Sequence, residues 1–152
     1  MSYSGNFVIR VYGIIVNENQ EVLLSHEFQH GIKMTKFPGG GLEFGEGTID
    51  GLKRELREEC NGQELMNIKH FYTTDFFQKA LFYDNKQLIS IYYIAELLKP
   101  IRFRISNIPF DFQENIDGNQ SFRWVKIKNL NEVEITFPID KFVAGKLKQH
   151  FL

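Results

Sequence analysis

The chain has 152 residues, of which 43% are hydrophobic and 24% are charged. These values are typical of one compact domain with a buried core, which we expect to span residues 1–152. A formal net charge of −1 and a pI near 6.4 argue against polymeric nucleic acid or an anionic membrane as a partner. The sequence has no apolar stretch long enough for a membrane span or a signal segment, and its single cysteine excludes an internal disulfide. We therefore expect a cytoplasmic protein.

The first part of the chain contains two predicted strands, a glycine-rich loop and a helix. The strands are predicted over residues 7–16 and 21–25, on either side of a polar turn at 17–20. Five glycines between positions 39 and 47 indicate a tight loop. A helix is predicted over 48–60, directly after this loop.

The rest of the chain adds further strands and a second helix. Strands are predicted over 68–74, 88–97, 101–105 and 122–127, and a helix from about 138 or 140 to 150. Strand and helix patterns that alternate in this way favour an α/β (α+β) fold in packed layers. The apolar strand 88–97 could lie in the core or form the interface of a homodimer.

The helix over 48–60 carries an apolar stripe and an acidic face. At about 100° of rotation per residue, the stripe consists of Ile49, Leu52, Leu56 and Cys60, which makes Cys60 a buried structural thiol. Glu55, Glu58 and Glu59 stand at i, i+3 and i+4, so their carboxylates are close together and repel each other. A divalent cation relieves such repulsion, and carboxylate oxygens suit Mg²⁺ or Mn²⁺.

A solvated helix face is the alternative interpretation of these acids. Lys53, Arg54 and Arg57 are available as ion-pair partners, and Arg54 and Glu58 have i, i+4 spacing. Charge runs on helices are usually solvated. The glycine loop at a fixed distance before the helix favours a phosphate and metal site instead.

Loop and helix together resemble the Nudix box. That pattern is Gly, five residues, Glu, seven residues, Arg-Glu, an aliphatic residue, any residue, Glu-Glu, any residue, Gly and an aliphatic residue. The matching residues are Gly40, Glu46, Arg54, Glu55, Leu56, Glu58 and Glu59. Asn61 and Gly62 depart from the pattern at its glycine and last aliphatic positions, although Asn tolerates the left-handed conformation that a helix C′ position requires. The resemblance implies the Nudix fold, a mixed β-sheet held between α-helices.

The resemblance also implies roles for individual residues. Glu58 and Glu59 are the expected direct metal ligands, and Glu55 is either a further ligand or the catalytic base. Arg54 is expected to orient Glu55. The backbone carbonyl of Gly39 is expected to bind a metal ion, with Gly40 and Glu46 in supporting roles. Many Nudix enzymes add an acid from outside the box, and Glu114 in the polar stretch 111–118 is the candidate.

The implied activity is Mg²⁺-dependent (or Mn²⁺-dependent) hydrolysis of a diphosphate linkage in a nucleoside diphosphate joined to another group. The substrate would be a small-molecule nucleotide, either a nucleoside triphosphate or a nucleotide sugar. Enzymes specific for ADP-ribose often carry a proline some fifteen residues past the box, and residues 76–80 contain none. A non-catalytic nucleotide sensor is the main alternative, although every acid of the box is present. A diphosphate isomerase of the same fold is a poorer fit, because it would require a larger chain.

Overall fold

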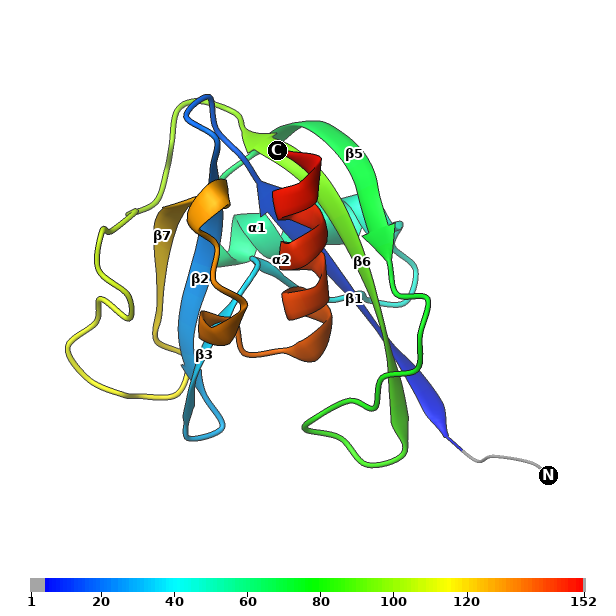
Figure 1. The fold of residues 1–152 in the computed structure, drawn as a ribbon. Coiled ribbons are helices and arrows are strands. Elements are labelled where there is room, and N and C mark those ends of the chain that lie inside the picture. Colours follow the sequence, from blue (N-terminus) through cyan, green and yellow to red (C-terminus); the bar gives the residue numbers. More distant parts are fainter. Residues whose placement is uncertain (1–4, 152) are drawn as a thin grey trace.

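The computed structural model describes residues 5–151, and its first sheet is mixed (Figure 1). This sheet has the order β4-β1-β6-β5, with β1 parallel to β6 and the other neighbours antiparallel. Its strands are β1 (Asn6–Ile15), β4 (Gly39–Gly41), β5 (Leu65–Thr73) and β6 (Lys86–Leu97). β6 lies between β1 and β5, so its apolar residues belong to the interior of the sheet.

The second sheet is antiparallel, with the order β3-β2-β7. Its strands are β2 (Glu21–Gln29), β3 (Ile32–Lys36) and β7 (Gln120–Lys126). The helices are α1 (Thr48–Glu59) and α2 (Pro138–His150), and two short 3-10 turns, η1 (Ile127–Asn129) and η2 (Glu132–Glu134), lie before α2.

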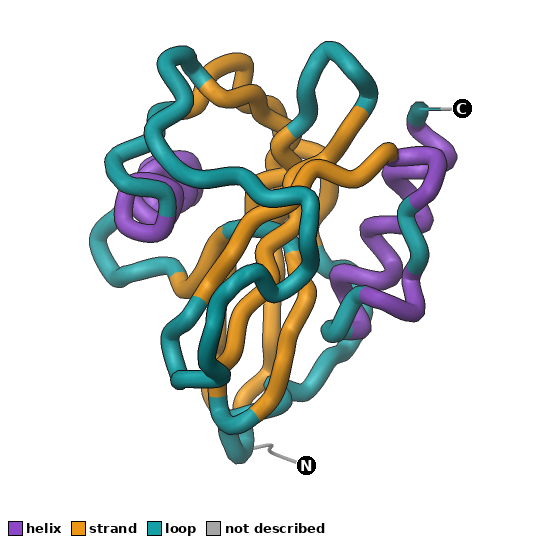
Figure 2. The backbone as a smooth tube through the Cα atoms, turned by 90° about the vertical axis from the view of Figure 1, so that its left-hand side faces the viewer, coloured by secondary structure: helices purple, strands orange, loops and turns teal. Residues whose placement is uncertain are grey.

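The two helices lie on opposite sides of the strands (Figure 2). Leu52, Leu56 and Cys60 from the α1 side pack with Val11 and Ile15 of β1 in one buried cluster. A second cluster joins β1, β2 and β6 to α2; its α2 members are Ile139, Val143, Ala144 and Leu147. This arrangement confirms the predicted α+β fold, with sheet structure held between helices.

Three sequence predictions were wrong in detail. Residues 101–105 form no strand, because backbone groups there bond to side chains: Arg102 N–H donates to Gln63 Oε1 (2.8 Å) and its carbonyl accepts from Asn61 Nδ2 (2.8 Å). Apolar residues alternate in this segment because Phe103 and Ile105 pack against the buried cluster that contains Leu52, although the segment pairs with no strand. Ile49, assigned to the apolar stripe, is 39% exposed.

The third error concerns the glycine run, which pairs with β1 as β4 instead of forming a loop. β3 was not predicted either; its pairing with β2 extends β2 beyond the predicted residue 25, to Gln29. No helix within residues 5–151 is both long and apolar enough to cross a membrane.

Candidate active site

The glycines of β4 allow the backbone to lie directly against a helix carboxylate. Gly39 has φ +145°, and a Cβ there would lie 2.1 Å from the Val11 carbonyl oxygen, so a side chain is excluded. A Cβ at Gly40 would lie 2.5 Å from Oε2 of Glu55. By contrast, a Cβ at Gly41 would meet open space. Gly40 therefore leaves room for the Glu55 carboxylate against β4.

Arg54 connects the loop, β4 and the acidic face of α1. Its Nη2 donates to Glu46 Oε1 (2.7 Å) and to the Gly41 carbonyl (2.8 Å), while Nη1 donates to Glu55 Oε1 (3.0 Å) and Glu58 Oε2 (3.2 Å). These hydrogen bonds lower the pKa of Glu46 to about 2 and raise the pKa of Arg54. The guanidinium is thus hydrogen-bonded to Glu55, the residue that Arg54 was expected to orient, and to β4.

The three acids of the helix face differ in exposure. The Glu58 side chain is 58% exposed, whereas that of Glu55 is 14% exposed. Glu59 is more deeply placed: its Oε2 is buried and has no hydrogen-bond partner within the described chain. Burial raises the pKa of Glu59 to about 7, although the positive charge of Lys36 lowers it in part. An unpaired buried carboxylate oxygen of this kind is suited to bind a cation.

The helix ends in the way that the resemblance requires. Asn61 has φ +52° and Gly62 has φ +79°, and Gly62 N–H donates to the Arg57 carbonyl (2.8 Å). This hydrogen bond is that of a Schellman motif, with Asn61 in the left-handed C′ position. Asn61 therefore replaces the glycine of the Nudix pattern without changing the helix end.

Lys36, which the sequence did not single out, is a buried cation beside these acids. It is 5% exposed, and its Nζ lies 3.1 Å from Glu27 Oε2 and donates to the Gly39 carbonyl at 3.1 Å. Burial alone would lower the pKa of Lys36, but the carboxylates of Glu27 and Glu59 outweigh it and raise that pKa. The predicted metal-binding carbonyl of Gly39 is therefore hydrogen-bonded to an ammonium group.

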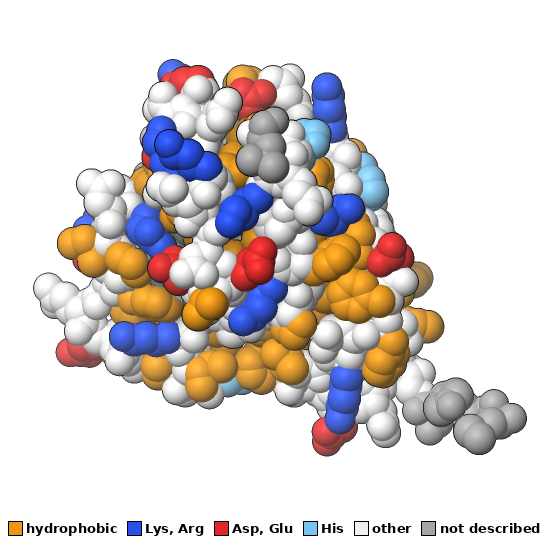
Figure 3. Space-filling model, viewed as in Figure 1, with side chains coloured by type: hydrophobic (Ala, Val, Ile, Leu, Met, Phe, Trp, Pro, Cys, Tyr) orange, Lys and Arg blue, Asp and Glu red, His pale blue; other side chains and the backbone are white. Residues whose placement is uncertain are grey.

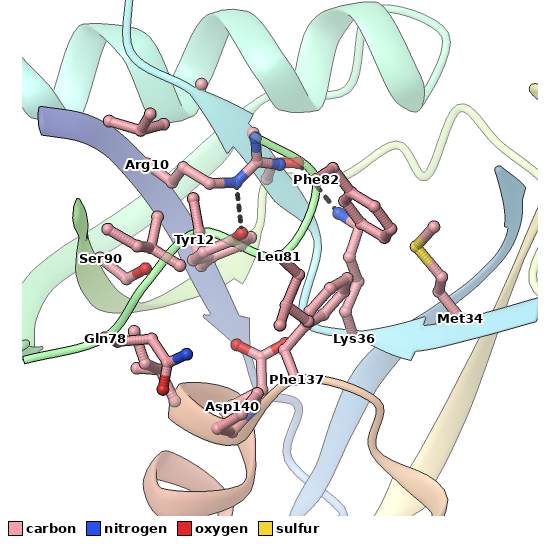
Figure 4. A pocket seen from close by; sticks show the side chains of 18 of the residues that line it. Arg10, Tyr12, Met34, Lys36, Gln78, Leu81, Phe82, Ser90, Phe137 and Asp140 are labelled. Atoms are coloured by element: carbon pink, nitrogen blue, oxygen red, sulfur yellow. Dashed lines mark hydrogen bonds between the residues drawn. The ribbon is translucent and has the colours of Figure 1, made fainter. Parts of the chain in front are cut away.

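A cavity of about 340 Å³ extends from β4 and α1 to the first turn of α2. Glu55, Glu59, Gly39 and Gly40 line one end. In Figure 4, Arg10 and Lys36 point toward this end, and Asp140 and Phe137 lie at the other. The cavity therefore joins the box acids to a more distant polar and aromatic region.

Two buried polar pairs stand along the cavity. Arg10 Nε donates to the Tyr12 hydroxyl at 2.5 Å, and the Tyr92 hydroxyl donates to Asp140 Oδ1. The other oxygen of Asp140 is buried and has no partner within residues 5–151. Burial raises the pKa of Asp140 to about 6, although the Tyr92 hydrogen bond and the charge of Lys36 oppose this shift. Asp140 therefore places a buried carboxyl group with one unpaired oxygen at this end of the cavity.

Apolar side chains gather near the cavity mouth. Figure 3 shows them on the lower part of the face that carries α2. Leu81, Phe82 and Tyr83 of the β5–β6 connection line the cavity and are 57%, 39% and 50% exposed. The ring of Phe82 stacks on His30, at a centroid distance of 4.4 Å. These rings offer a surface on which a planar group could stack.

The structure brings most, but not all, of the predicted site residues together. Gly39, Gly40, Glu55 and Glu59 line the cavity, and Arg54 bonds to Glu46, Glu55 and Glu58. Glu114 does not line the cavity, and its backbone carbonyl accepts a hydrogen bond from Asn119 Nδ2. Its catalytic role stays a prediction. Within residues 5–151, no three acidic, histidine or cysteine side chains are grouped closely enough to hold a metal ion together.

Sequence reasoning missed Arg10, Lys36 and Asp140. Arg10 and Asp140 lie far along the chain from the box and reach the cavity through strand pairing and the docking of α2, whereas Lys36 lies only three residues before Gly39. A charged residue within an otherwise apolar strand distinguished Arg10, whereas β3 carries a second lysine, Lys33, so that no such signal marked Lys36.

The protein has an α+β fold in which the glycine strand β4 and the acidic helix α1 form one end of a cavity. The NUDIX domain family model matches residues 6–145. The chain therefore belongs to the Nudix family and is a Nudix-type hydrolase.

Solved structures of low sequence identity share this fold. A MutT structure from work on Aliivibrio salmonicida and Vibrio cholerae is 24% identical, with a TM-score of 0.63 over 95% of this chain and 99% of that one. A NUDIX hydrolase from Nitrosomonas europaea is 16% identical, with a TM-score of 0.68 over 95% and 89% of the two chains. A MutT NUDIX hydrolase from Burkholderia pseudomallei is 12% identical, with a TM-score of 0.67 over 91% and 96%. No curated relative matches the sequence.

Proposed function

We propose that the protein hydrolyses a diphosphate linkage in a nucleoside diphosphate joined to another group, with Mg²⁺ or Mn²⁺ as cofactor. The observation that carries this proposal is the position of Glu55 and Glu59 at one end of a cavity of about 340 Å³. A cavity of this size is within the usual range for a small-molecule ligand. The substrate class is a nucleoside triphosphate or a nucleotide sugar.

The metal fits the residues that are present. Glu59 has an unpaired buried oxygen, and Glu58 is exposed next to it on the same helix face. Glu58 and Glu59 would hold the ion, with Glu55 either a further ligand or the base. Bound Mg²⁺ would neutralise phosphate charge and lower the pKa of a water molecule.

The chain's own side chains would orient the reaction. Arg54 holds the Glu55 carboxylate at 3.0 Å and fixes it under Gly40, so that an oxygen of Glu55 is positioned to take a proton from water. Arg10 lies along the cavity with a raised pKa, because Tyr12, Glu55 and Asp140 outweigh the effect of burial. Its guanidinium therefore stays charged and can pair with a phosphate oxygen.

The far end of the cavity would hold the nucleoside. Asp140 Oδ2 has no partner within the described chain, so it can accept from an N–H group at the edge of a base. Phe82 and Phe137, which also line the cavity, offer aromatic surface for the base itself. A carboxylate and aromatic rings at the Asp140 end of the cavity support a nucleotide substrate, because phosphate groups alone would leave that end of the cavity empty.

The test is release of phosphate, pyrophosphate or nucleoside monophosphate from a panel of triphosphates, nucleotide sugars and dinucleotides, with and without Mg²⁺. We expect the protein to hydrolyse one class of these substrates. Glu58→Gln should reduce kcat by about 10²-fold or more, since it removes the charge of a metal ligand. Glu64→Gln is the matched control, because Glu64 lies just beyond α1 and pairs only with exposed Arg57. Nucleotide binding without Mg²⁺- or Mn²⁺-dependent product would contradict the proposal and support a non-catalytic sensor.

A further inference from the structure

Lys36 has surroundings that are unusual for a lysine side chain. The residue is 5% exposed, and the neighbours of its ammonium group are oxygen atoms: Glu27 Oε2 at 3.1 Å, the Gly39 carbonyl at 3.1 Å and the Phe37 carbonyl at 3.5 Å. The ring of Tyr12 lies on another side, with its centroid 5.5 Å from Nζ. Carboxylate and carbonyl oxygens are also the atoms that surround hard metal cations in proteins.

Two groups near Lys36 are the same groups that a metal ion would use. The Gly39 carbonyl, a predicted metal ligand, accepts a hydrogen bond from the ammonium. Glu59, the other predicted ligand nearby, contributes negative charge that raises the pKa of Lys36. Both Gly39 and Glu59 line the same end of the cavity as Lys36. The ammonium and a metal ion therefore compete for the Gly39 carbonyl oxygen, next to the charge of Glu59.

We infer that the Lys36 ammonium is a resident cation that occupies the metal position at the Gly39 carbonyl, so that the site binds fewer divalent ions than its oxygen atoms could hold. The inference rests on the proposed function, because it concerns the metal ions of the same site. Glu58 and Glu59 remain for a divalent ion, while the Gly39 carbonyl faces the fixed positive charge of Lys36 instead.

Charge and distance explain why the ammonium excludes a second ion. A divalent ion on the Gly39 carbonyl would require an oxygen about 2.1 Å away, next to an ammonium that lies 3.1 Å from the same oxygen. The two cations would repel each other in a buried site, where screening by water is weak. Glu27 holds Lys36 in place, with its Oε2 3.1 Å from the ammonium nitrogen.

Direct measurement of metal stoichiometry tests this inference without any substrate. Mn²⁺ is titrated into the intact protein and free Mn²⁺ is followed by its electron paramagnetic resonance signal. We expect Lys36→Gln to bind one more Mn²⁺ per chain than the unmodified protein. Lys33→Gln is the matched control, since Lys33 lies on the same strand, is exposed and contacts the Phe110 ring. Its stoichiometry should be unchanged. Lys36→Arg retains the charge and should gain no ion.

Equal stoichiometry in Lys36→Gln and the unmodified protein would overturn the inference, as would a loss of Mn²⁺ sites in the variant. An extra ion in Lys36→Gln would support it even if the unmodified protein bound no Mn²⁺ and hydrolysed nothing. Failure of the hydrolase proposal is thus distinguishable from failure of this one. Far-ultraviolet circular dichroism checks that the variant is folded.

A second measurement uses the unmodified protein and does not depend on the folding of a variant. The side-chain ammonium of Lys36, buried and hydrogen-bonded, should give a slowly exchanging NMR resonance that is distinct from those of exposed lysines. We expect this resonance to persist when Mg²⁺ is added to saturation. Its collapse into the exchange behaviour of exposed lysines would mean that the metal displaces the ammonium, and would overturn the inference.

Discussion

Arg54 is the residue on which the geometry of the acidic face depends. One guanidinium bonds to Glu46, Glu55 and Glu58 and to the Gly41 carbonyl. A lysine has the same charge but lacks the planar fork that reaches several oxygens at once. The role of Arg54 is therefore one of position as well as charge.

We predict that Arg54→Lys lowers kcat by about 10²-fold with little change in KM, because misplaced carboxylates reduce transition-state contacts more than ground-state binding. The measurement is steady-state kinetics on the substrate identified from the panel. Arg57→Lys is the control, since Arg57 lies on the same helix but pairs with exposed Glu64, and it should retain nearly full activity. An Arg54→Lys effect confined to KM would contradict a positioning role.

Asp140 gives a pH dependence of stability whose sign can be worked out. Its folded-state pKa, raised by burial to about 6, lies above the value of an unfolded aspartate. The folded state therefore binds the Asp140 proton more tightly than the unfolded state does. The resulting contribution of Asp140 to the free energy of unfolding is greatest below the unfolded-state pKa and is lost as pH rises through 6. For a pKa shift of this size, the contribution of Asp140 to the free energy of unfolding falls by about 2 kcal/mol between pH 4 and pH 7.

We predict that Asp140→Asn, which keeps an acceptor for Tyr92 but cannot ionise, gains stability relative to the unmodified protein as pH rises from 4 to 7. The relative gain in the free energy of unfolding should be about 2 kcal/mol. Urea unfolding at both pH values measures it. A difference between the two proteins that is the same at both pH values would show that Asp140 titrates alike in the folded and unfolded states.

At the scale of elements, β4 shows how a three-residue strand sets the distance between sheet and helix. We predict that Gly40→Ala reduces activity by about 10²-fold or more, because the new Cβ would lie 2.5 Å from the Glu55 carboxylate and displace it. Gly41→Ala is the neighbouring control: its Cβ would meet open space, and most of the activity should remain. Equal losses in both variants would indicate that the strand, and not the Glu55 contact, is disturbed.

The end of α1 gives an element-scale prediction about stability. Asn61 combines a left-handed φ of +52° with a hydrogen bond from its amide to the Arg102 carbonyl at 2.8 Å. Asn61→Ala loses the hydrogen bond and strains the backbone, so we expect the free energy of unfolding to fall by about 2 kcal/mol. Asn61→Gly relieves the strain and should lose about 1 kcal/mol or less. Chemical denaturation of both variants measures the difference, and an inverted order would contradict the capping role.

The elements that sequence predicted well are those with local physical causes. α1 follows from a repeating apolar stripe and an asparagine at its end, and the long strands from runs of β-branched and aromatic residues. β4 could not be predicted, because three glycines have no strand preference and pair only when β1 is adjacent. Residues 101–105 have the alternation of apolar and polar residues that is typical of a strand. They form no strand, because the backbone of Arg102 is hydrogen-bonded to the side chains of Gln63 and Asn61. Arg10 and Asp140 reach the site only through tertiary contacts, which spacing along the chain does not encode.

At the scale of the whole molecule, the site lies where separate elements meet: β4 supplies the glycines, α1 supplies the acids, β3 supplies Lys36 and α2 supplies Asp140. A ligand at this junction therefore stabilises the packing of several elements together. Metal binding should accordingly be visible as a change in global stability, since an ion that binds the folded state alone shifts the unfolding equilibrium.

We predict that Mg²⁺ at about ten times its dissociation constant stabilises the fold by about 1.4 kcal/mol, which for a chain of this size corresponds to a rise in Tm of roughly 3–6 °C. The physical reason is that Glu55, Glu58 and Glu59 share one helix face and Glu59 has an unpaired buried oxygen. Thermal melts with Mg²⁺, and with NaCl at equal ionic strength, measure the specific part. Glu58→Gln should lose most of the shift and Glu64→Gln should keep it. An equal rise with NaCl would assign the effect to screening of the acidic face, and the metal would then have no specific place in the folded molecule.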